Sequence, residues 1–334
     1  MLVDRWGRLI TYLRVSVTDR CNLRCVYCMP PEGVQRLEHE AILRYEEIAE
    51  VVRVAAAQGI RRVRITGGEP LVRSGLPALI RLIHAMPGIE DISLTTNGLL
   101  LEKMARELKE AGLNRINISL DTLQPEKFKR ITRGGSLDTV LRGIAMAEAV
   151  GLAPIKINAV AMRGVNEDEL VDLARLSVDH PWHVRFIELM PVLNQESWGA
   201  GFPPPADAFL PIHAIKRLLE PLGLASVARP EQPADRVIEG PAHEYQLPGA
   251  QGRIGFISPL SEHFCHECNR MRVTADGNFR PCLLKDEEIA FLPALRSGQP
   301  VLPYLLQAVE SKPAGHNLDE QDRPTGRSMQ QIGG

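Results

Sequence analysis

Hydrophobic positions along the first two thirds of the chain switch repeatedly between two spacings. Residues 13–18 alternate apolar and polar side chains, which is the spacing of a half-buried strand. Residues 45–58 instead carry apolar side chains three and four positions apart, and Gly59 follows as a helix stop. The same switch predicts further strands at 61–66, 91–96, 115–120, 154–160 and 183–189, and helices at 76–85, 100–111, 137–150 and 167–178. Strands that alternate with helices in this way predict parallel βαβ units.

Turn residues follow several of these predicted strands, at Gly67-Gly68, Asn97-Gly98 and Asp121-Thr122. The alternation favours an α/β fold, an incomplete (β/α)6 TIM-like barrel, although spacing alone does not decide whether the sheet closes. In such folds the residues that do chemistry gather where the strands end. We therefore expect the functional site at the carboxyl ends of the strands.

The pattern changes after Pro191, where two stretches rich in Pro and Gly predict loops around a single helix. The loops cover 199–211 and 225–252, the helix 212–222, and short strands are expected at 253–257, 271–274 and 279–281. The polar residues from 311 onward predict a flexible tail. The expected divisions are a barrel at 1–200, a C-terminal α+β extension at 201–310 and the tail at 311–334.

Composition narrows the class of protein. Lys and Arg number 39 against 41 Asp and Glu, a net charge of -2, so no basic excess is available to coat a nucleic acid. The charged start lacks the apolar core of an export signal, and no run approaches the roughly 20 apolar residues of a membrane helix. We expect a cytoplasmic protein with neither nucleic-acid nor membrane partners. In that compartment grouped cysteines indicate metal or redox chemistry.

Three of the six cysteines, Cys21, Cys25 and Cys28, follow the first predicted strand directly. Three thiolates from one short loop can hold three corners of an iron–sulfur cube and leave the fourth iron open to an exchangeable ligand. A zinc site normally has four ligands, and no fourth Cys or His lies in this loop. The spacing therefore favours an iron–sulfur cluster over zinc.

The other three cysteines, Cys265, Cys268 and Cys282, flank a predicted hairpin near the C-terminus. Their spacing alone leaves two alternatives open. One is a second cluster with an open iron, and the other is a structural zinc with His263 or His266 as the fourth ligand.

The first group, with an aromatic residue before the last cysteine, resembles the signature of the radical S-adenosylmethionine enzymes. Thr66-Gly-Gly-Glu-Pro70 resembles the same family's GGEP element. The resemblance implies a 4Fe–4S cluster whose open iron binds S-adenosylmethionine and reduces it to a 5′-deoxyadenosyl radical. It assigns cofactor contacts to Tyr27, Gly68, Ser119 and Met190, with Tyr27 near the adenine.

Most of the chain, from 13–21 to the terminal Ile332-Gly-Gly334, resembles one family within these enzymes, the GTP 3′,8-cyclases of molybdenum cofactor biosynthesis. The resemblance implies a lyase whose radical removes the 3′ hydrogen of GTP, so that C3′ bonds to C8 of the guanine. It also implies a second 4Fe–4S cluster at the second cysteine group and a catalytic role for Gly333 and Gly334. The GTP contacts it assigns are Arg14, Arg64, Thr95, Lys156, Arg270, Arg272 and the backbone of Met271.

Partners and competing functions follow from the same resemblance. It implies a downstream cyclic pyranopterin monophosphate synthase, leaves a homodimer open and does not identify the electron donor. Two alternatives remain: a radical enzyme that modifies peptides and uses the second cluster as an auxiliary centre, and a zinc-stabilised binding protein. The absence of a P-loop motif disfavours an ordinary GTPase.

Overall fold

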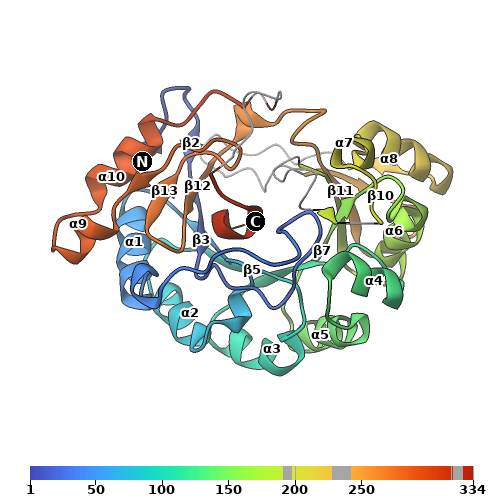
Figure 1. Cartoon of the computed structure of the whole chain (residues 1–334), viewed down its shortest axis with the longest axis horizontal. Helices are drawn as coiled ribbons and strands as arrows, with labels where there is room; N and C mark the ends of the chain where they lie inside the picture. The colour runs from blue at the N-terminus through green and yellow to red at the C-terminus, as the bar shows by residue number, and fades with distance from the viewer. Residues whose placement is uncertain (191–197, 200, 228–241, 317, 319–325, 334) are drawn as a thin grey trace.

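The computed structural model describes residues 1–190, 198–199, 201–227, 242–316, 318 and 326–333. At its centre six parallel strands curl into a barrel, which Figure 1 shows end-on. They pair in chain order: β3 (Tyr12–Ser16), β4 (Arg62–Thr66), β5 (Asp91–Thr96), β6 (Arg115–Ser119), β7 (Ile155–Ala161) and β8 (His183–Glu188). The six-stranded parallel fold predicted from the spacing of apolar residues is therefore confirmed. No helix in the described ranges is long and apolar enough to cross a membrane.

Helices cover the outside of these strands (Figure 1). The predicted ones are α1 (Tyr45–Ala57), α2 (Leu76–His84), α3 (Leu101–Glu110), α5 (Leu137–Ala149) and α6 (Leu170–Asp179). Each buries one apolar face; α1, for example, buries Ile48, Val51 and Val52 against the sheet. A further helix, α4 (Pro125–Thr132), was not predicted, because most of its residues are charged or polar and only Phe128, Ile131 and Thr132 are buried.

The C-terminal region extends both edges of the sheet. β11 (Arg253–Ile257) pairs in parallel with β8, and β12 (Arg270–Val273) pairs in parallel with β3. Antiparallel strands continue outward to β9 (Ala225–Ser226) through β10 (His243–Gln246), and to β14 (Ile289–Ala290) through β13 (Asn278–Arg280). The two end strands are not paired with each other in the described sheet, so the barrel is incomplete as predicted.

The remaining elements lie outside this sheet. Helices α7 (Pro205–Ala208) and α8 (Ile212–Leu219) lie beside β11 and β10, and α9 (Leu292–Arg296) and α10 (Leu302–Glu310) lie on the other flank (Figure 1). An N-terminal hairpin of β1 (Leu2–Val3) and β2 (Leu9–Ile10) was not predicted. None of these elements fills the interior of the barrel, which contains the candidate functional site.

Candidate active site

One cavity of about 340 Å³ lies inside the barrel, a size typical of small-molecule sites. It is lined by residues from the strands, the cysteine loops and the C-terminal segment. All but two of the predicted site residues line it: Arg14, Cys21, Cys25, Tyr27, Cys28, Arg64, Gly68, Thr95, Ser119, Lys156, Met190, Cys265, Cys268, Arg270, Arg272, Cys282 and Gly333. Of the two exceptions, Met271 has a fully buried side chain in the core, and Gly334 lies outside the described residues.

The first cysteine group lies on the loop after β3, and the chain that leads into this loop packs against the GGEP turn. Backbone bonds shape the loop: Cys28 N–H donates to the Cys25 carbonyl at 2.9 Å, and Leu23 N–H donates to Cys21 Sγ at 3.4 Å. Burial raises the pKa of Cys21 to about 11 and that of Cys28 to about 12. These buried sulfurs are therefore unfavourable as free thiolates and would give up their protons on binding a metal.

The glycines of the GGEP turn allow it to pack on the chain that leads into the cysteine loop. A Cβ on Gly67 would lie 2.7 Å from the Thr18 carbonyl oxygen, and one on Gly68 would lie 2.4 Å from that of Arg20. At these distances no side chain can replace the hydrogen. Gly68 N–H also donates to the Thr18 carbonyl at 2.7 Å, so the turn and the loop form one rigid unit.

Glu69 ties this unit to the next strand. Its carboxylate accepts hydrogen bonds from Leu71 N–H at 3.0 Å, Thr96 Oγ1 at 2.7 Å and Asn97 N–H at 2.7 Å. Burial nevertheless raises the pKa of Glu69 to about 7. Its role in the fold is to join the GGEP turn to the end of β5.

Tyr27 is held in place by a buried carboxyl. Its hydroxyl donates to Asp121 Oδ2 at 2.8 Å, and the other carboxyl oxygen accepts Val160 N–H at 2.8 Å. Burial raises the pKa of Asp121 to about 6. Asp121 lies in a turn noted in the sequence, but its contact with Tyr27 was not predicted. Ser119 at the end of β6 and Met190 just after β8 line the same part of the cavity.

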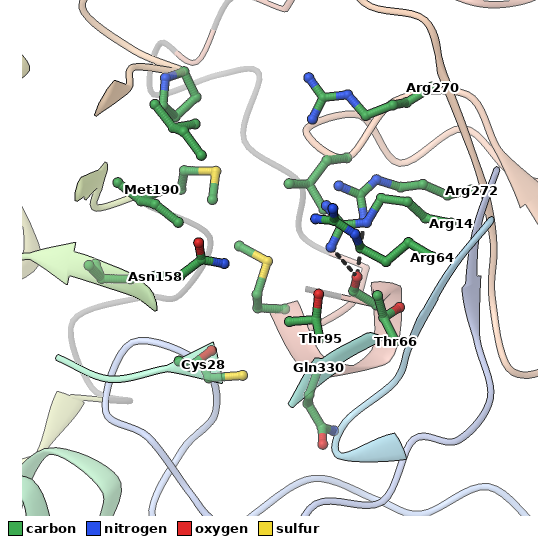
Figure 2. Close-up of a pocket in the computed structure, with 18 of the residues that line it drawn as sticks. Arg14, Cys28, Arg64, Thr66, Thr95, Asn158, Met190, Arg270, Arg272 and Gln330 are labelled. Atoms are coloured by element: carbon green, nitrogen blue, oxygen red, sulfur yellow. Dashed lines mark hydrogen bonds between the residues drawn. The ribbon is translucent and has the colours of Figure 1, made fainter. Parts of the chain in front are cut away.

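Three predicted GTP contacts form one row across neighbouring strands. Arg14 on β3 is the register partner of Arg64 on β4 and of Arg272 on β12. Because all three occupy equivalent positions on adjacent strands, their side chains point to the same face, which is the barrel interior. Figure 2 shows these guanidinium groups, with Arg270 beyond them, on one side of the cavity and Met190 and Asn158 on the other.

The electrostatics of this row are those of an anion site. Burial, followed by repulsion from Arg272 and Arg64, lowers the pKa of Arg14 well below its usual range. Among the residues that the structure describes, Arg64, Arg270 and Arg272 form no ion pair with a carboxylate. Guanidinium groups stay charged in proteins. The concentration of Arg64, Arg270 and Arg272 without carboxylate partners in the described chain therefore favours a multiply charged anion in the cavity.

A second group of cations lies on the opposite strands. Lys156 on β7 is 4% exposed, and burial together with Arg185, Arg115 and Arg64 lowers its pKa to about 6. Arg185 on β8 and Arg115 on β6 line the cavity but were not predicted. Arg185 follows Val184 and precedes Phe186 in the predicted strand 183–189. Its inward position could have been found from that alternation.

The second cysteine group lies at the open end of the hairpin formed by β12 and β13. A short turn carries Cys265 and Cys268 before β12, and Cys282 follows β13, so the hairpin brings them together. Burial opposes ionisation of Cys268, but Arg270 and Lys312 lower its pKa to about 6. A thiolate is favoured here even without a metal.

The two histidines near the second cysteine group, His263 and His266, differ in their position relative to the cysteines. The His266 side chain is 75% exposed and lies 3.7 Å from Glu267, away from the cavity. His263 instead groups with Cys265 and His316, whose ligand atoms all lie within 4.8 Å of one another. Across the described chain this is the one such group close enough for a single ion, and neither cysteine trio by itself forms one. His316 was not predicted, because it lies in the polar segment after α10.

The C-terminal residues differ from the flexible tail that the sequence predicts. Met329–Ile332 form a short 3-10 turn that is capped by Ser328, whose backbone N–H donates to the Gln331 side-chain oxygen at 3.0 Å. The Gly333 carbonyl accepts hydrogen bonds from Arg14 at 3.3 Å and Arg272 at 3.2 Å, and Figure 1 shows this end of the chain at the centre of the barrel.

An ion-pair network holds these residues in place. Arg327 bonds Asp276 and Glu288, each at 2.7 Å, just before the turn begins. The spacing of apolar residues does not predict this ordered segment, because charged side chains anchor it.

Two family models match the chain: Radical SAM superfamily over residues 15–177, and Molybdenum Cofactor Synthesis C over residues 182–318. Curated relatives include a GTP 3′,8-cyclase of Pelotomaculum thermopropionicum, 51% identical over 334 residues, with 99% of each chain covered. A GTP 3′,8-cyclase of Heliobacterium modesticaldum is 50% identical over 339 residues, with 100% of each chain covered. The solved structure of Streptococcus suis SuiB bound to S-adenosylmethionine has a TM-score of 0.62 at 17% identity, over 92% of this chain and 67% of that one, which is a likeness of fold.

Proposed function

The chain belongs to the GTP 3′,8-cyclase family of radical S-adenosylmethionine enzymes, and on that premise we propose how its residues divide the reaction. The reaction converts GTP to (8S)-3′,8-cyclo-7,8-dihydroguanosine 5′-triphosphate and begins molybdenum cofactor biosynthesis. The observation that carries the proposal is the arrangement of the cavity, in which two open cysteine trios and one row of arginines face the same space.

Cys21, Cys25 and Cys28 hold the first 4Fe–4S cluster, and S-adenosylmethionine binds beside it. When bound, the cluster and S-adenosylmethionine supply the radical that removes the 3′ hydrogen of GTP. The chain's own contribution is position: Gly68, Ser119 and Met190 line the cavity and would lie beside the cofactor, and Asp121 orients Tyr27 through the 2.8 Å hydrogen bond.

The triphosphate of GTP occupies the cation-lined wall. Arg14, Arg64 and Arg272 present their guanidinium groups side by side, which suits recognition of phosphate oxygens two at a time. Arg270 and Arg185 add charge on either side, and Lys156 adds a positive charge when a bound triphosphate raises its pKa. Thr95 lines the same space, and the Met271 backbone lies between two of the arginines on β12. The carbonyl of Gly333 already occupies two of these arginines, which supports a role for the C-terminal glycines near the substrate.

Cys265, Cys268 and Cys282 would hold a second 4Fe–4S cluster, whose open iron would bind the guanine. Within the described residues the three sulfurs do not form a group close enough for one ion, which supports a cluster at this trio. His263 and His316 lie close to Cys265, so a zinc ion held by these three residues is the competing site that metal analysis distinguishes. The product then passes to a cyclic pyranopterin monophosphate synthase, which completes the pathway step.

Anaerobically reconstituted protein tests the proposal. Iron and acid-labile sulfide are counted per chain, and the loaded protein is incubated with GTP, S-adenosylmethionine and dithionite. We expect two clusters and GTP-dependent release of 5′-deoxyadenosine and methionine. A colourless protein with stoichiometric zinc, or a doubly loaded protein that forms no 5′-deoxyadenosine, would overturn it.

A further inference from the structure

A buried lysine just beyond α10 lies against the second cysteine trio. Lys312 is 3% exposed, and its ammonium donates to the Arg270 carbonyl at 2.9 Å and to the Pro281 carbonyl at 2.8 Å. Arg270 lies two positions after Cys268, and Pro281 immediately precedes Cys282. One ammonium therefore joins the two arms of the hairpin that carry these cysteines.

The same ammonium lies beside the cysteine sulfurs. Lys312 lines the cavity together with Cys265, Cys268 and Cys282. In the described part of the chain Lys312 forms no ion pair with a carboxylate, so its positive charge there is not neutralised by an acidic side chain.

The N-terminal hairpin fixes the segment that carries this lysine. Arg8 donates to the carbonyls of Pro313 at 2.6 Å, Ala314 at 3.1 Å and Cys265 at 2.7 Å. A buried ion pair of 2.6 Å with Asp4 holds the guanidinium in that orientation. Because the same group grips the 313–314 backbone and the cysteine turn, Lys312 has little freedom to move away from Cys268.

We propose that Lys312 is a positioning residue for the second cluster: it holds Cys268 and Cys282 at the spacing that ligation needs, and its charge raises the cluster's reduction potential. The inference rests on the second cluster proposed above. A positive charge next to an iron–sulfur centre stabilises the reduced state, which carries one more electron. A buried charge acts strongly because little water screens it.

The test uses the full chain with Cys25→Ser, so that the second cluster is observed alone. Lys312→Met keeps the length of the side chain and removes its charge and donors, whereas Lys312→Arg keeps the charge. Lys127→Met is the matched control, because the Lys127 side chain is also largely buried and its ammonium bonds the carboxylates of Asp168 and Glu169. We measure iron per chain by metal analysis. The midpoint potential of the cluster is measured by anaerobic redox titration, followed by electron paramagnetic resonance.

We expect Lys312→Met to lose second-cluster iron, or to keep it with a more negative midpoint potential, and Lys312→Arg to lie closer to the unsubstituted lysine. Lys127→Met should change neither. Unchanged iron and potential in Lys312→Met would overturn the inference. So would loss of the first cluster as well when Cys25 is intact, because the lysine would then serve folding only. If the Cys25→Ser chain with Lys312 intact holds no cluster, the proposed second cluster fails instead.

Discussion

Lys156 should make GTP binding depend on pH. Its pKa is lowered to about 6 by burial and by Arg185, Arg115 and Arg64, so this lysine is mostly neutral at pH 7 in the protein without substrate. A triphosphate beside it favours the ammonium and raises the pKa again. GTP binding is then accompanied by uptake of a proton.

The uptake of a proton determines the direction and the size of the change in GTP affinity with pH. Because the pKa is low in the free protein and higher in the complex, affinity is fully expressed below pH 6 and falls as pH rises toward the pKa of the complex. While the proton uptake stays near one, affinity falls about tenfold per pH unit, or about 1.4 kcal/mol. The interval from about pH 7.5 to 9 is suitable, because phosphate groups ionise near pH 6.

Isothermal titration calorimetry of the anaerobic, cluster-loaded protein without S-adenosylmethionine measures this directly. Titrations at pH 8 in buffers of different ionisation enthalpy give the number of protons taken up. The matched variant is Lys156→Arg, which stays charged throughout and should take up almost none. Equal proton uptake by the two proteins would refute the assignment of Lys156 to the phosphate site.

Three substitutions test the other parts of the site. Cys25→Ser should remove the first cluster's iron and all 5′-deoxyadenosine formation, as measured by iron analysis and chromatography; retained formation would show that Cys25 is not a ligand. Gly68→Ala should lower the free energy of unfolding by roughly 1–3 kcal/mol, as measured by thermal unfolding, because the added Cβ meets the Arg20 backbone. The control Gly134→Ala should lower it little, because the nearest side chain, Leu23, is 3.9 Å away; equal effects of the two variants would contradict the packing described. Arg272→Ala should weaken GTP binding by about 1.5–3 kcal/mol in calorimetry, while both clusters still assemble. Arg175→Ala, on the exposed face of α6, should leave GTP binding unchanged. Normal GTP binding by Arg272→Ala would show that Arg272 is not part of the phosphate site.

The barrel could be predicted because its strands and helices differ sharply in apolar spacing. All six strands and five helices lie within a few residues of their predicted positions, since each strand has buried residues that alternate or run together. Helix α4 was missed because its surface charges outnumber its buried residues. The parallel pairing of β12 with β3 was also beyond prediction, because hydrophobic spacing does not identify a partner so distant along the chain.

The site could be predicted only where residues form motifs. The cysteine spacings and the GGEP turn led to the cavity, and the resemblance supplied the arginines. Lys312 belongs to no motif, and its role depends on which segments become neighbours in the fold, whereas the inward position of Arg185 follows from the alternation of its strand. The resemblance implies that the C-terminal tail enters the site, but the turn at Met329–Ile332 was not predicted, because its anchors are the ion pairs of Arg327, which join segments far apart in sequence.

The most direct measurement of the proposed reaction uses GTP with deuterium at C3′. Protein loaded with both clusters is incubated anaerobically with this GTP, S-adenosylmethionine and dithionite, and the 5′-deoxyadenosine is analysed by mass spectrometry. We predict 5′-deoxyadenosine that carries deuterium, together with the 3′,8-cyclised triphosphate. Unlabelled 5′-deoxyadenosine with GTP left intact would contradict the assignment of GTP as the molecule on which the radical acts.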